Sequence, residues 1–553
     1  MPEKDGVTRY LCAAAHLDRK FADDAIREFL TEPTRAFAPS PGVDGGAVLR
    51  EAVAARTRRR TRDAVLCVLV LLFAFAAPLT TLWWAVIAVI AALPRWGARL
   101  AKPSDPRNPQ AKSAPPALFV GLVVAALYLL VQIVMYTTGE SLFDSGSRYD
   151  SRYEEDPEPV PVVPFLIAPL IVLVVLLDRL AVWSMLTTSF RRDRFRAPTT
   201  TDRWLGERRV RSLGHRAHEA ELAAWDGGDA SAGAGPVTTV YRGYDPFVGA
   251  GLSYQPWSLA FPLDPKDPER AVTPFTLAEL YDAVQHDLLS LGRSAALSPS
   301  NRLSGLTAVE RVVVPADDLV ARVGEPEAAA VLPDPRGRPN RTLPREVADR
   351  VLAGPLEWMR YFRCFQVQTW DLDLVVSSYL HLGSDERMLY VEWTPCVLLP
   401  VKDGYRAIDR MSRTPWWPVV RTLGVLARLP VTFFGRLWHA TMPILPIREQ
   451  RGQVRAERYG ALRSLREMGA ADDVQDYFQR TDLERYIKLM EARLLRSIGR
   501  FLEERGIAVT EFMAQANQVF SKNVHIEGSV TGNVFVGDHN RSGNVSATAR
   551  PNG

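Results

Sequence analysis

Two pairs of side chains in this sequence have the type and spacing of metal ligands. His215 and His218 are three residues apart, so on a helix their imidazoles share one face and could bind zinc. Asp371 and Asp373 alternate along an extended stretch, so their carboxylates share one face of a strand and could hold a divalent cation for glycosyl transfer. The histidine pair has no identifiable third ligand, and both patterns are also typical of solvated faces. We therefore predict no metal site.

A short glycine motif is the remaining candidate for ligand binding. Gly249-Ala-Gly251-Leu-Ser resembles the start of sirtuin-like nucleotide-binding domains, in which a glycine turn delivers phosphates to the N-terminus of a helix. Here the motif is followed by Gln255-Pro256 and by an apolar run that ends at Pro262, which offers no helix to bind the pyrophosphate. A lone Gly-x-Gly is also a weak signal. A structural glycine turn is the favoured interpretation, nucleotide binding is the alternative, and no cofactor is predicted.

The elements that carry these candidates are organised around three apolar runs, at residues 64–94, 117–136 and 160–186. One crossing of a hydrocarbon core takes about 20 residues, so the second and third runs each predict one transmembrane helix. The first run is too long for one straight crossing and has arginines on both sides, which predicts a hairpin bent near Pro78. For this run, two crossings, a re-entrant loop and a single crossing all stay open. The preferred interpretation is about four transmembrane helices within residues 63–190.

The charges beside these runs predict their orientation. The loop at 137–159 carries seven acidic and two basic residues, whereas four arginines follow the last run within residues 191–196. Basic residues stay on the cytoplasmic side, so we predict a multi-pass plasma-membrane protein with both termini in the cytoplasm. Asp178 and Arg179, near the end of the last run, are either a functional pair inside the membrane or two side chains that reach its cytoplasmic boundary.

Residues 411–448 combine aromatic and basic side chains without any acid. Arginines interrupt every window that is long enough to cross the membrane, so the segment is predicted to be an amphipathic element on the bilayer surface. Its cations would lie at the headgroups, and anionic lipids are the expected partners. The candidate membrane-surface residues are Arg421, Arg428, Arg436, Trp417 and Trp438.

The rest of the chain is predicted to be cytoplasmic. Residues 1–62 contain an amphipathic helix at 8–30 and a short basic helix that leads to the membrane. Residues 197–410 alternate helices and strands without a repeated βαβ unit, which indicates an α+β domain.

Local patterns define this domain and the region that follows it. Residues 365–382 and 387–401 alternate apolar and polar side chains on either side of a Gly-Ser-Asp-Glu turn, which predicts a β-hairpin. Residues 449–520 are predicted to form C-terminal helices, at 449–468 and 482–505.

The tail at residues 521–553 repeats Asn-Val among regularly spaced glycines. The alternation of valine and isoleucine with polar residues predicts a short β-repeat in which strands are separated by turns. Three such repeats cannot bury a core alone, because a repeat stack needs neighbours on both faces. We therefore expect a homo-oligomer formed through this tail, and a disordered tail is the alternative.

Composition argues against several partners. The net charge is only +4, and 59 of the 67 basic residues are arginine beside abundant alanine and proline, so the arginine content does not indicate nucleic acid. The four cysteines are scattered and form no Cys-x-x-Cys pair, which supports neither a disulfide framework nor a zinc ribbon. We therefore expect no nucleic-acid partner.

Three stretches of the chain resemble uncharacterised actinobacterial multi-span membrane proteins: the opening RYLCAAAHLD, the motif PFVGAG followed by a tryptophan, and the Gly-Asn-Val tail. The resemblance implies a layout and no activity. The favoured function is a cytoplasm-facing sensing or scaffolding protein that self-associates and is not an enzyme. One alternative is a membrane-anchored enzyme that binds a nucleotide or metal through residues 237–263 or 366–400, and another is a transporter or channel.

Overall fold

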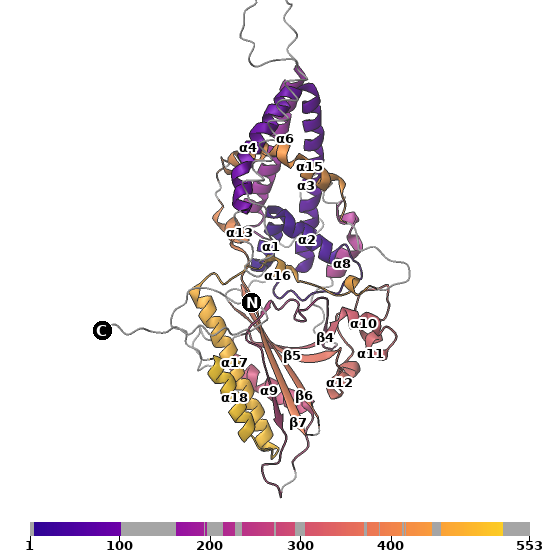
Figure 1. Cartoon of the computed structure of the whole chain (residues 1–553), viewed down its shortest axis with the longest axis vertical. Coiled ribbons are helices and arrows are strands. Elements are labelled where there is room, and N and C mark those ends of the chain that lie inside the picture. Colours follow the sequence, from indigo (N-terminus) through magenta and orange to yellow (C-terminus); the bar gives the residue numbers. More distant parts are fainter. Residues whose placement is uncertain are drawn as a thin grey trace, which may run out of the picture.

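The computed structural model is elongated and has three tiers (Figure 1). A β-sheet with its helices forms the lower tier, short N-terminal helices form the middle tier, and long helices form the upper tier. The predicted run at 117–136, the loop at 137–159 and the tail after Asn523 lie outside the described residues. The structure describes residues 5–100, 162–192, 194–195, 214–226, 235–269, 272–293, 303, 305–354, 356–369, 373–385, 387–411, 414, 416–444 and 455–523.

The lower tier is built on a mixed sheet of seven strands. The strands are β1 (Val237–Tyr241), β2 (Leu252–Ser253), β3 (Trp257–Pro262), β4 (Thr307–Pro315), β5 (Arg360–Thr369), β6 (Leu374–Ser384) and β7 (Met388–Leu398). Their order is β1-β4-β5-β6-β7-β2, and β3 also pairs with β7. β1 and β4 run parallel, and the other described pairs run antiparallel. With its helices, this tier is an α+β region.

Helices pack against this sheet. They are α9 (Leu277–Arg293), α10 (Ala316–Ala321), α11 (Pro326–Val331), α12 (Arg345–Ala353), α17 (Tyr477–Glu504) and α18 (Thr510–Asn523). Apolar residues at helical spacing on α17, such as Ile487 and Leu494, join Trp393 of β7 in one hydrophobic core. The Asp476 side chain accepts a hydrogen bond from an amide of the first turn of α17, so this helix begins before the predicted start at 482.

The predicted β-hairpin is part of a meander of three strands. Residues 365–382 would form a strand about 60 Å long, because a strand rises about 3.3 Å per residue. The chain instead leaves the strand after Thr369 and re-enters at Leu374, so β5 and β6 pair side by side, with Val367 opposite Val376. β6 and β7 then pair as the hairpin. Both strands contribute apolar side chains to the same hydrophobic core.

The middle tier consists of buried N-terminal helices. α1 (Asp5–Leu17) and α2 (Arg19–Phe29) are separate, because the Asp18 side chain accepts hydrogen bonds from amides of the first turn of α2. The predicted single helix at 8–30 is therefore wrong. The predicted helix at 449–468 is not continuous: its described part, from residue 455, contains the short elements at 456–458 and 465–469. The short elements beside the N-terminal helices are α8 (Glu219–Asp226), α13 (Asp403–Arg406), η2 (Ala407–Arg410) and α16 (Leu465–Gly469), and η3 (Ala456–Arg458) lies beside α10.

Polar contacts of buried side chains hold this middle tier together. His16 Nε2 lies 2.7 Å from a Glu51 carboxylate oxygen, and both side chains are almost fully buried. Burial lowers the pKa of His16 to about 4, although the Glu51 carboxylate acts in the opposite direction. Arg9 makes two hydrogen bonds to Asp409 of η2, at 2.7 and 3.0 Å. The N-terminal helices are therefore attached to the segment that leads into the upper tier.

The upper tier contains five helices. They are the second half of α3 (Gly45–Ala76), α4 (Pro78–Leu100), α6 (Val162–Thr188), α14 (Trp416–Leu426) and α15 (Leu429–Thr441). α3 rises from the middle tier and ends beside Pro78, which begins α4 because proline suits the first position of a helix. α4 then turns back, and the Trp84 ring meets the Phe73 ring of α3 edge to face at 6.1 Å.

The prediction of about four transmembrane helices is wrong. Among the described residues, Val163–Thr188 is the one helix that is long and apolar enough to cross a membrane, and Pro78–Val89 is a shorter apolar helix. The apolar part of α3 is too short for a crossing, because it continues from the arginine-rich turns before Asp63 and stops at Ala77. The observed architecture is an α+β region joined to a helical upper tier with one candidate membrane helix.

Candidate functional site

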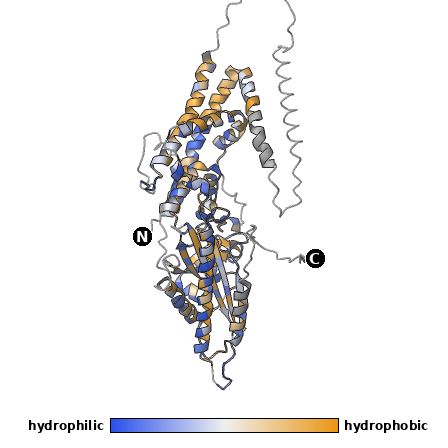
Figure 2. Ribbon diagram, turned by 90° about the vertical axis from the view of Figure 1, so that its left-hand side faces the viewer, coloured by the Kyte–Doolittle hydropathy of each residue, from blue (hydrophilic) through white to orange (hydrophobic). Residues whose placement is uncertain are grey.

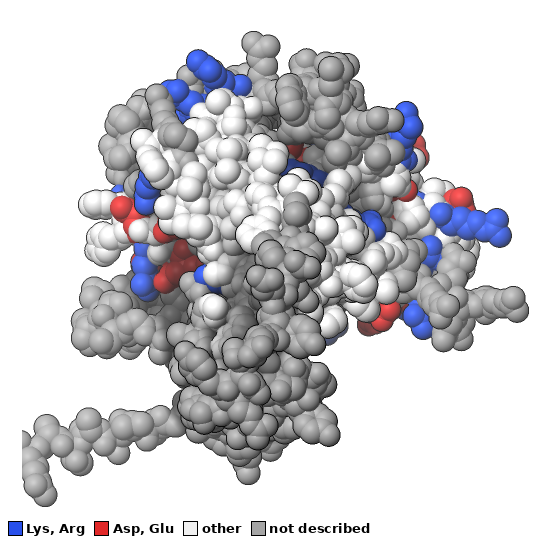
Figure 3. All heavy atoms as spheres, turned by 90° about the horizontal axis from the view of Figure 1, so that it is seen from above, with Lys and Arg blue, Asp and Glu red and all other residues white. Residues whose placement is uncertain are grey.

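The described helices of the upper tier are largely hydrophobic (Figure 2), and many of their large apolar side chains are exposed. Phe75 of α3 is 93% exposed and Phe165 of α6 is 69% exposed. Seen from above, the described surface is largely uncharged, and coloured charged side chains lie toward its edge (Figure 3). Soluble proteins rarely expose so large an apolar patch, so this surface marks an interaction with a partner or a membrane. We call it the apolar end; its exposed residues include Val68, Leu71, Phe75, Trp83, Ile87, Phe165, Leu166, Leu177, Val420, Leu423 and Phe434.

α14 and α15 follow each other at the apolar end, where α14 packs against α6 and α15 packs against α3, and we call these two consecutive helices the α14–α15 hairpin. At its closed tip, Leu426 packs in one apolar cluster with Phe73, and Trp84 Nε1 donates a hydrogen bond to the Leu426 carbonyl oxygen at 3.2 Å. Near its other end, Arg436 contacts Asp63 of α3. Phe73 lies about 15 Å farther along α3 than Asp63, at 1.5 Å per residue. α15 therefore runs along α3 and does not lie across it.

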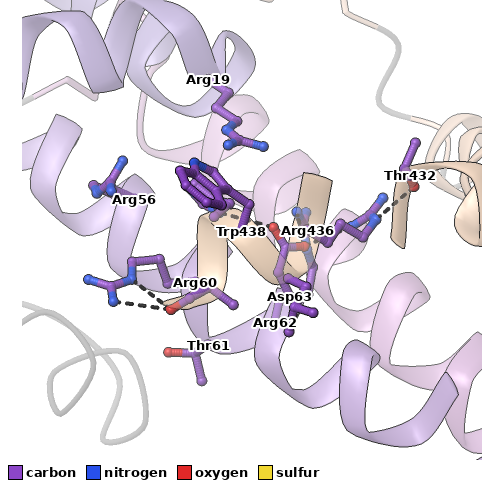
Figure 4. Close-up of polar contacts among 12 residues, drawn as sticks. Arg19, Arg56, Arg60, Thr61, Arg62, Asp63, Thr432, Arg436 and Trp438 are labelled. Atoms are coloured by element: carbon purple, nitrogen blue, oxygen red, sulfur yellow. Dashed lines mark hydrogen bonds and ion pairs between the residues drawn. The ribbon is translucent and has the colours of Figure 1, made fainter. Parts of the chain in front are cut away.

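A layer of charged side chains lies at the base of the apolar end, and Asp63 is at its centre (Figure 4). The Asp63 carboxylate is almost fully buried and accepts hydrogen bonds from Arg62 at 2.8 Å and Arg436 at 2.7 Å. His439 Nδ1 of α15 lies 3.1 Å from its other oxygen. Asp63 therefore joins α3 to α15. We call this group the charged layer, and it comprises Arg58, Arg62, Asp63, Asp178, Arg436 and His439.

Asp178 extends the charged layer to a third helix, α6. Its carboxylate oxygens lie 2.8 Å from Arg62 and 3.3 Å from Arg58, both on α3. The partner that the sequence suggested, Arg179, is adjacent in the chain, and adjacent residues on a helix point in different directions. Asp178 therefore pairs with arginines of another helix, and the charged layer links α3 to both α6 and α15.

Two further arginines of α3 bind the end of α15. Arg60 donates a hydrogen bond to the Ala440 carbonyl oxygen at 3.1 Å (Figure 4). Arg56 donates one to the Met442 carbonyl oxygen at 3.3 Å. The last carbonyls of a helix lack partners within it and carry partial negative charge, so cations there are stabilising. These contacts hold the outgoing end of the hairpin against α3.

The structure separates the five predicted membrane-surface residues. Arg436 belongs to the charged layer, and its side chain is only 15% exposed. Arg428 precedes α15 at the tip of the hairpin. Arg421 on α14 and Trp438 on α15 are exposed. Trp417 lies in α14, and its side chain is outside the described part of the structure.

The glycine motif is a closed turn that binds a side chain of this protein. The amides of Gly249 and Gly251 donate hydrogen bonds to the same Glu467 oxygen, at 2.8 and 2.9 Å. Both glycines have positive φ, +92° and +86°, and a Cβ on either would lie within 2.2 Å of a backbone oxygen. The other Glu467 oxygen accepts a hydrogen bond from the Ser464 amide at 2.7 Å, and burial raises the pKa of this carboxyl. The donors that a phosphate would use are therefore occupied by Glu467.

Described members of the two candidate metal-ligand pairs contact other groups. His215 Nε2 lies 3.2 Å from a backbone carbonyl oxygen of α3, and burial lowers the pKa of His218. Asp373 forms an ion pair with Arg406, and Asp371 lies outside the described residues. Within the part of the chain that the structure describes, no three His, Cys, Asp or Glu side chains form a group that could hold a metal ion.

Sequence reasoning missed Asp63 and Glu467. A signal for Asp63 was present, because it is the only acidic residue between Glu51 and Asp105 and directly follows a cluster of arginines. Glu467 had a weaker signal, the capping box that it forms with Ser464 at the start of α16. Nothing in the sequence indicates that this helix lies beside the glycine turn.

These features define a class of protein with three parts. An α+β domain is joined by buried helices to an apolar helical end, and a charged layer lies at the base of that end. The AbeC-like domain matches residues 256–536, slightly more than half of the chain, and the chain belongs to this family. No curated protein and no solved structure matches the chain. The matched residues include β3 to β7 and the α14–α15 hairpin, whereas α3, α4 and α6 precede them.

Proposed function

We propose that this protein is a plasma-membrane protein whose apolar end is embedded in the bilayer and whose α+β domain senses or scaffolds a partner in the cytoplasm. The observation that carries this proposal is the apolar surface of the upper tier, which lies directly above the charged layer. Apolar surface gains about 25 cal/mol per Å² when it leaves water. Arginines at the base of that surface suit the level of the lipid headgroups.

Within this proposal, α6 crosses the bilayer, and the hairpins α3–α4 and α14–α15 enter it without crossing. α6 has 27 residues, and a crossing takes about 20. α14 and α15 have 11 and 13 residues. At 1.5 Å per residue they reach about 16–20 Å, short of the hydrocarbon thickness of about 30 Å. A re-entrant hairpin is tolerated when its non-helical tip is packed against protein, and the Trp84 hydrogen bond at the tip fulfils that condition.

Both termini face the cytoplasm in this proposal. The N-terminal helices and the α+β region lie on the arginine-rich side of the apolar end, and basic residues favour the cytoplasmic side. α6 supplies one crossing, and the second predicted crossing, at 117–136, lies outside the described residues. In a cysteine-free background, Ser145→Cys is expected to react with an impermeant thiol reagent in intact cells, and Ser104→Cys only after lysis. The reverse pattern would refute the orientation.

Extraction of membranes at alkaline pH tests the insertion itself. The full chain is expected to stay in the membrane pellet and to float with vesicles. Glutamate at both Leu170 and Leu173, exposed positions of α6, is expected to release the protein, because an acid inside the membrane costs about 2.5–3.5 kcal/mol. The matched control is Leu462→Glu, at an exposed leucine outside the apolar end. Release of the unchanged chain by alkali would contradict the proposal.

Anionic lipids and further copies of the chain are the partners that we propose. Exposed Arg421 lies on the hairpin and would meet lipid phosphates. Self-association through the tail at 521–553 rests on its repeated Asn-Val pattern. The test of self-association is given below.

A further inference from the structure

We infer that Arg9 couples the membrane helix α6 to the segment that connects the sheet to the α14–α15 hairpin, so that a displacement of α6 changes the end of β7. This inference rests on the proposed insertion into a membrane and adds to it the way in which the membrane end regulates the α+β domain. The coupling element consists of Arg9 on α1, the Phe190 carbonyl oxygen just after α6, and Asp409 on η2, and we call it the Arg9 bridge.

The Arg9 guanidinium contacts both sides of the bridge at once. The side chain is buried, and its Nη1 donates a hydrogen bond to the Phe190 carbonyl oxygen at 2.8 Å. Nη1 and Nη2 also donate to the two Asp409 carboxylate oxygens, at 2.7 and 3.0 Å. Such two-pronged contacts between arginine and carboxylate are directional, and a buried arginine that loses its carboxylate is strongly destabilised. The end of α6 and η2 therefore keep fixed positions relative to Arg9.

Two neighbouring side chains strengthen the bridge at Asp409. Tyr10 Oη donates a hydrogen bond to Asp409 Oδ2 at 2.6 Å, and Arg192 Nε lies 3.8 Å from the same oxygen. Tyr10 belongs to α1 and Arg192 follows α6, so the carboxylate is contacted from both helices. Asp409 is therefore fixed in position, although its side chain is 33% exposed.

Asp409 lies on the stretch of chain that joins the lower tier to the upper tier. The chain passes from β7 through α13 and η2 to α14. Near the sheet, the Lys402 amide donates a hydrogen bond to a carbonyl oxygen of α16 at 3.0 Å, and α13 packs against α1. Residues 399–411 are therefore held at Lys402 and at Asp409, and a movement of Asp409 strains the end of β7 as well as the start of α14.

A second contact joins α6 to the hairpin farther from the sheet. Arg62 binds both Asp63, the carboxylate that contacts α15, and Asp178 of α6, each at 2.8 Å. Asp178 precedes Phe190 by 12 positions, so this contact lies about 18 Å from the Arg9 bridge along α6. α6 is thus joined to the hairpin at the charged layer and to the chain that enters the hairpin at the Arg9 bridge. A displacement of α6 in the bilayer therefore moves the hairpin and residues 399–411 together.

Hydrogen exchange of the full chain in vesicles tests the coupling. The vesicles contain phosphatidylglycerol and phosphatidylcholine, and mass spectrometry follows amide exchange in each peptide. Asp178→Asn weakens the contact of α6 with α3 and loosens α6 without changing the Arg9 bridge. We expect this substitution to raise the exchange rate of residues 399–411 about threefold or more, within the range of coupling between residues of one polar network. The exchange of α9, in the lower tier, should stay unchanged.

The same substitution in a chain with a broken bridge separates coupling from a purely local role. Asp409→Asn keeps the shape of the side chain and removes the charge that Arg9 binds, so in this background Asp178→Asn should have almost no further effect on residues 399–411. Tyr10→Phe is the milder variant, because it removes one hydrogen bond to Asp409, and it should reduce the effect without abolishing it. Asp24→Asn is the matched control: it changes a surface ion pair of α2, and Asp178→Asn should keep its full effect there.

Three results would overturn the inference. An equal effect of Asp178→Asn with the intact and the broken bridge would mean that α6 acts on residues 399–411 through another contact. A change confined to α6 and α3 would mean that the bridge holds α6 in place and transmits nothing. A change of the same size in α9 would mean a general loss of stability. In each case membrane insertion still holds, whereas release of the unchanged chain by alkali would overturn the proposed function itself.

Discussion

Asp63 in the upper tier is a buried carboxylate and Glu467 beside the α+β region is a half-buried one, and they bind different kinds of partner. Asp63 contacts the charged side chains of Arg62 and Arg436, which lie on two helices. Glu467 accepts hydrogen bonds from three backbone amides, two of them in one glycine turn. The contacts of Asp63 depend on its charge, whereas those of Glu467 depend on the position of its oxygens. Ion pairs therefore join helices in the upper tier, whereas the Glu467 carboxylate stabilises the backbone of the glycine turn.

Removing the charge of Asp63 is expected to have the largest effect. Asp63→Ala leaves buried arginines without their counter-charge, and we expect a loss of about 3–5 kcal/mol in the free energy of unfolding. The measurement is unfolding of the purified full chain in detergent. Asp63→Asn should lower the free energy of unfolding by nearly as much, because the amide keeps the shape of the side chain but not its negative charge.

The matched control for Asp63 is Asp24, which pairs with Arg27 at 3.6 Å on the surface of α2. Asp24→Ala should cost less than about 1 kcal/mol, because exposed ion pairs contribute little. Equal stability of the Asp63 and Asp24 variants would contradict the role of the charged layer.

Acid is expected to destabilise the middle tier through the His16–Glu51 pair. The pKa of His16 is about 4 in the folded chain and about 6.5 in the unfolded chain, so the unfolded chain binds the proton first as the pH falls. The contribution of this site is therefore fully present above pH 6.5 and decreases toward pH 4, by about 3 kcal/mol in total. Denaturant unfolding between these two pH values measures the loss. His16→Asn should flatten the dependence, and an unchanged slope would contradict the burial of a neutral imidazole.

Substitution of Glu467 should separate geometry from charge. Glu467→Ala leaves three amides without their acceptor, and we expect a loss of about 2–3 kcal/mol. Glu467→Gln keeps one oxygen for the two glycine amides and should cost about half as much. Exposed Glu503 provides the control, since Glu503→Gln removes only a surface contact with Lys266. If Glu467→Gln were as costly as Glu467→Ala, the charge of Glu467 would matter as it does for Asp63.

Deletion of residues 524–553 should have the smallest effect on stability. The deletion starts after the end of α18, so the contacts of both carboxylates stay intact. If the tail assembles copies of the chain, light scattering in detergent should show a smaller species, with unfolding unchanged. An identical mass before and after the deletion would contradict self-association.

Local structure could be predicted where a single signal dominates. Thr276 accepts a hydrogen bond from the Glu279 amide at the start of α9, and the alternation along β6 and β7 corresponds to paired strands. Prediction failed where two signals compete. Asp18 stops a helix that the apolar stripe would continue, and in α3 an arginine-rich stretch and an apolar stretch share one helix. Counting apolar residues therefore overestimated the number of transmembrane helices.

For the candidate site, the sequence showed the residue types and not their partners. The absence of acids from residues 411–448 suggested that Arg436 binds lipid, yet Asp63 reaches it from 373 positions earlier in the chain. Glu467 likewise binds the Gly249 amide across 218 positions. A single sequence does not show which residues far apart in the chain lie close together in space.

The sequence by itself determined most local elements, the three apolar runs, and the arginines before the first run and after the third. The reason is that helix caps, periodicity and hydropathy depend on residues a few positions apart. Only the tertiary structure decided that the α14–α15 hairpin enters the apolar end, that Asp63 and Asp178 neutralise arginines of α3 and α15, and that Glu467 occupies the glycine turn. The physical reason is that a buried charge or amide must find a partner, and packing of the whole chain determines which partner is near.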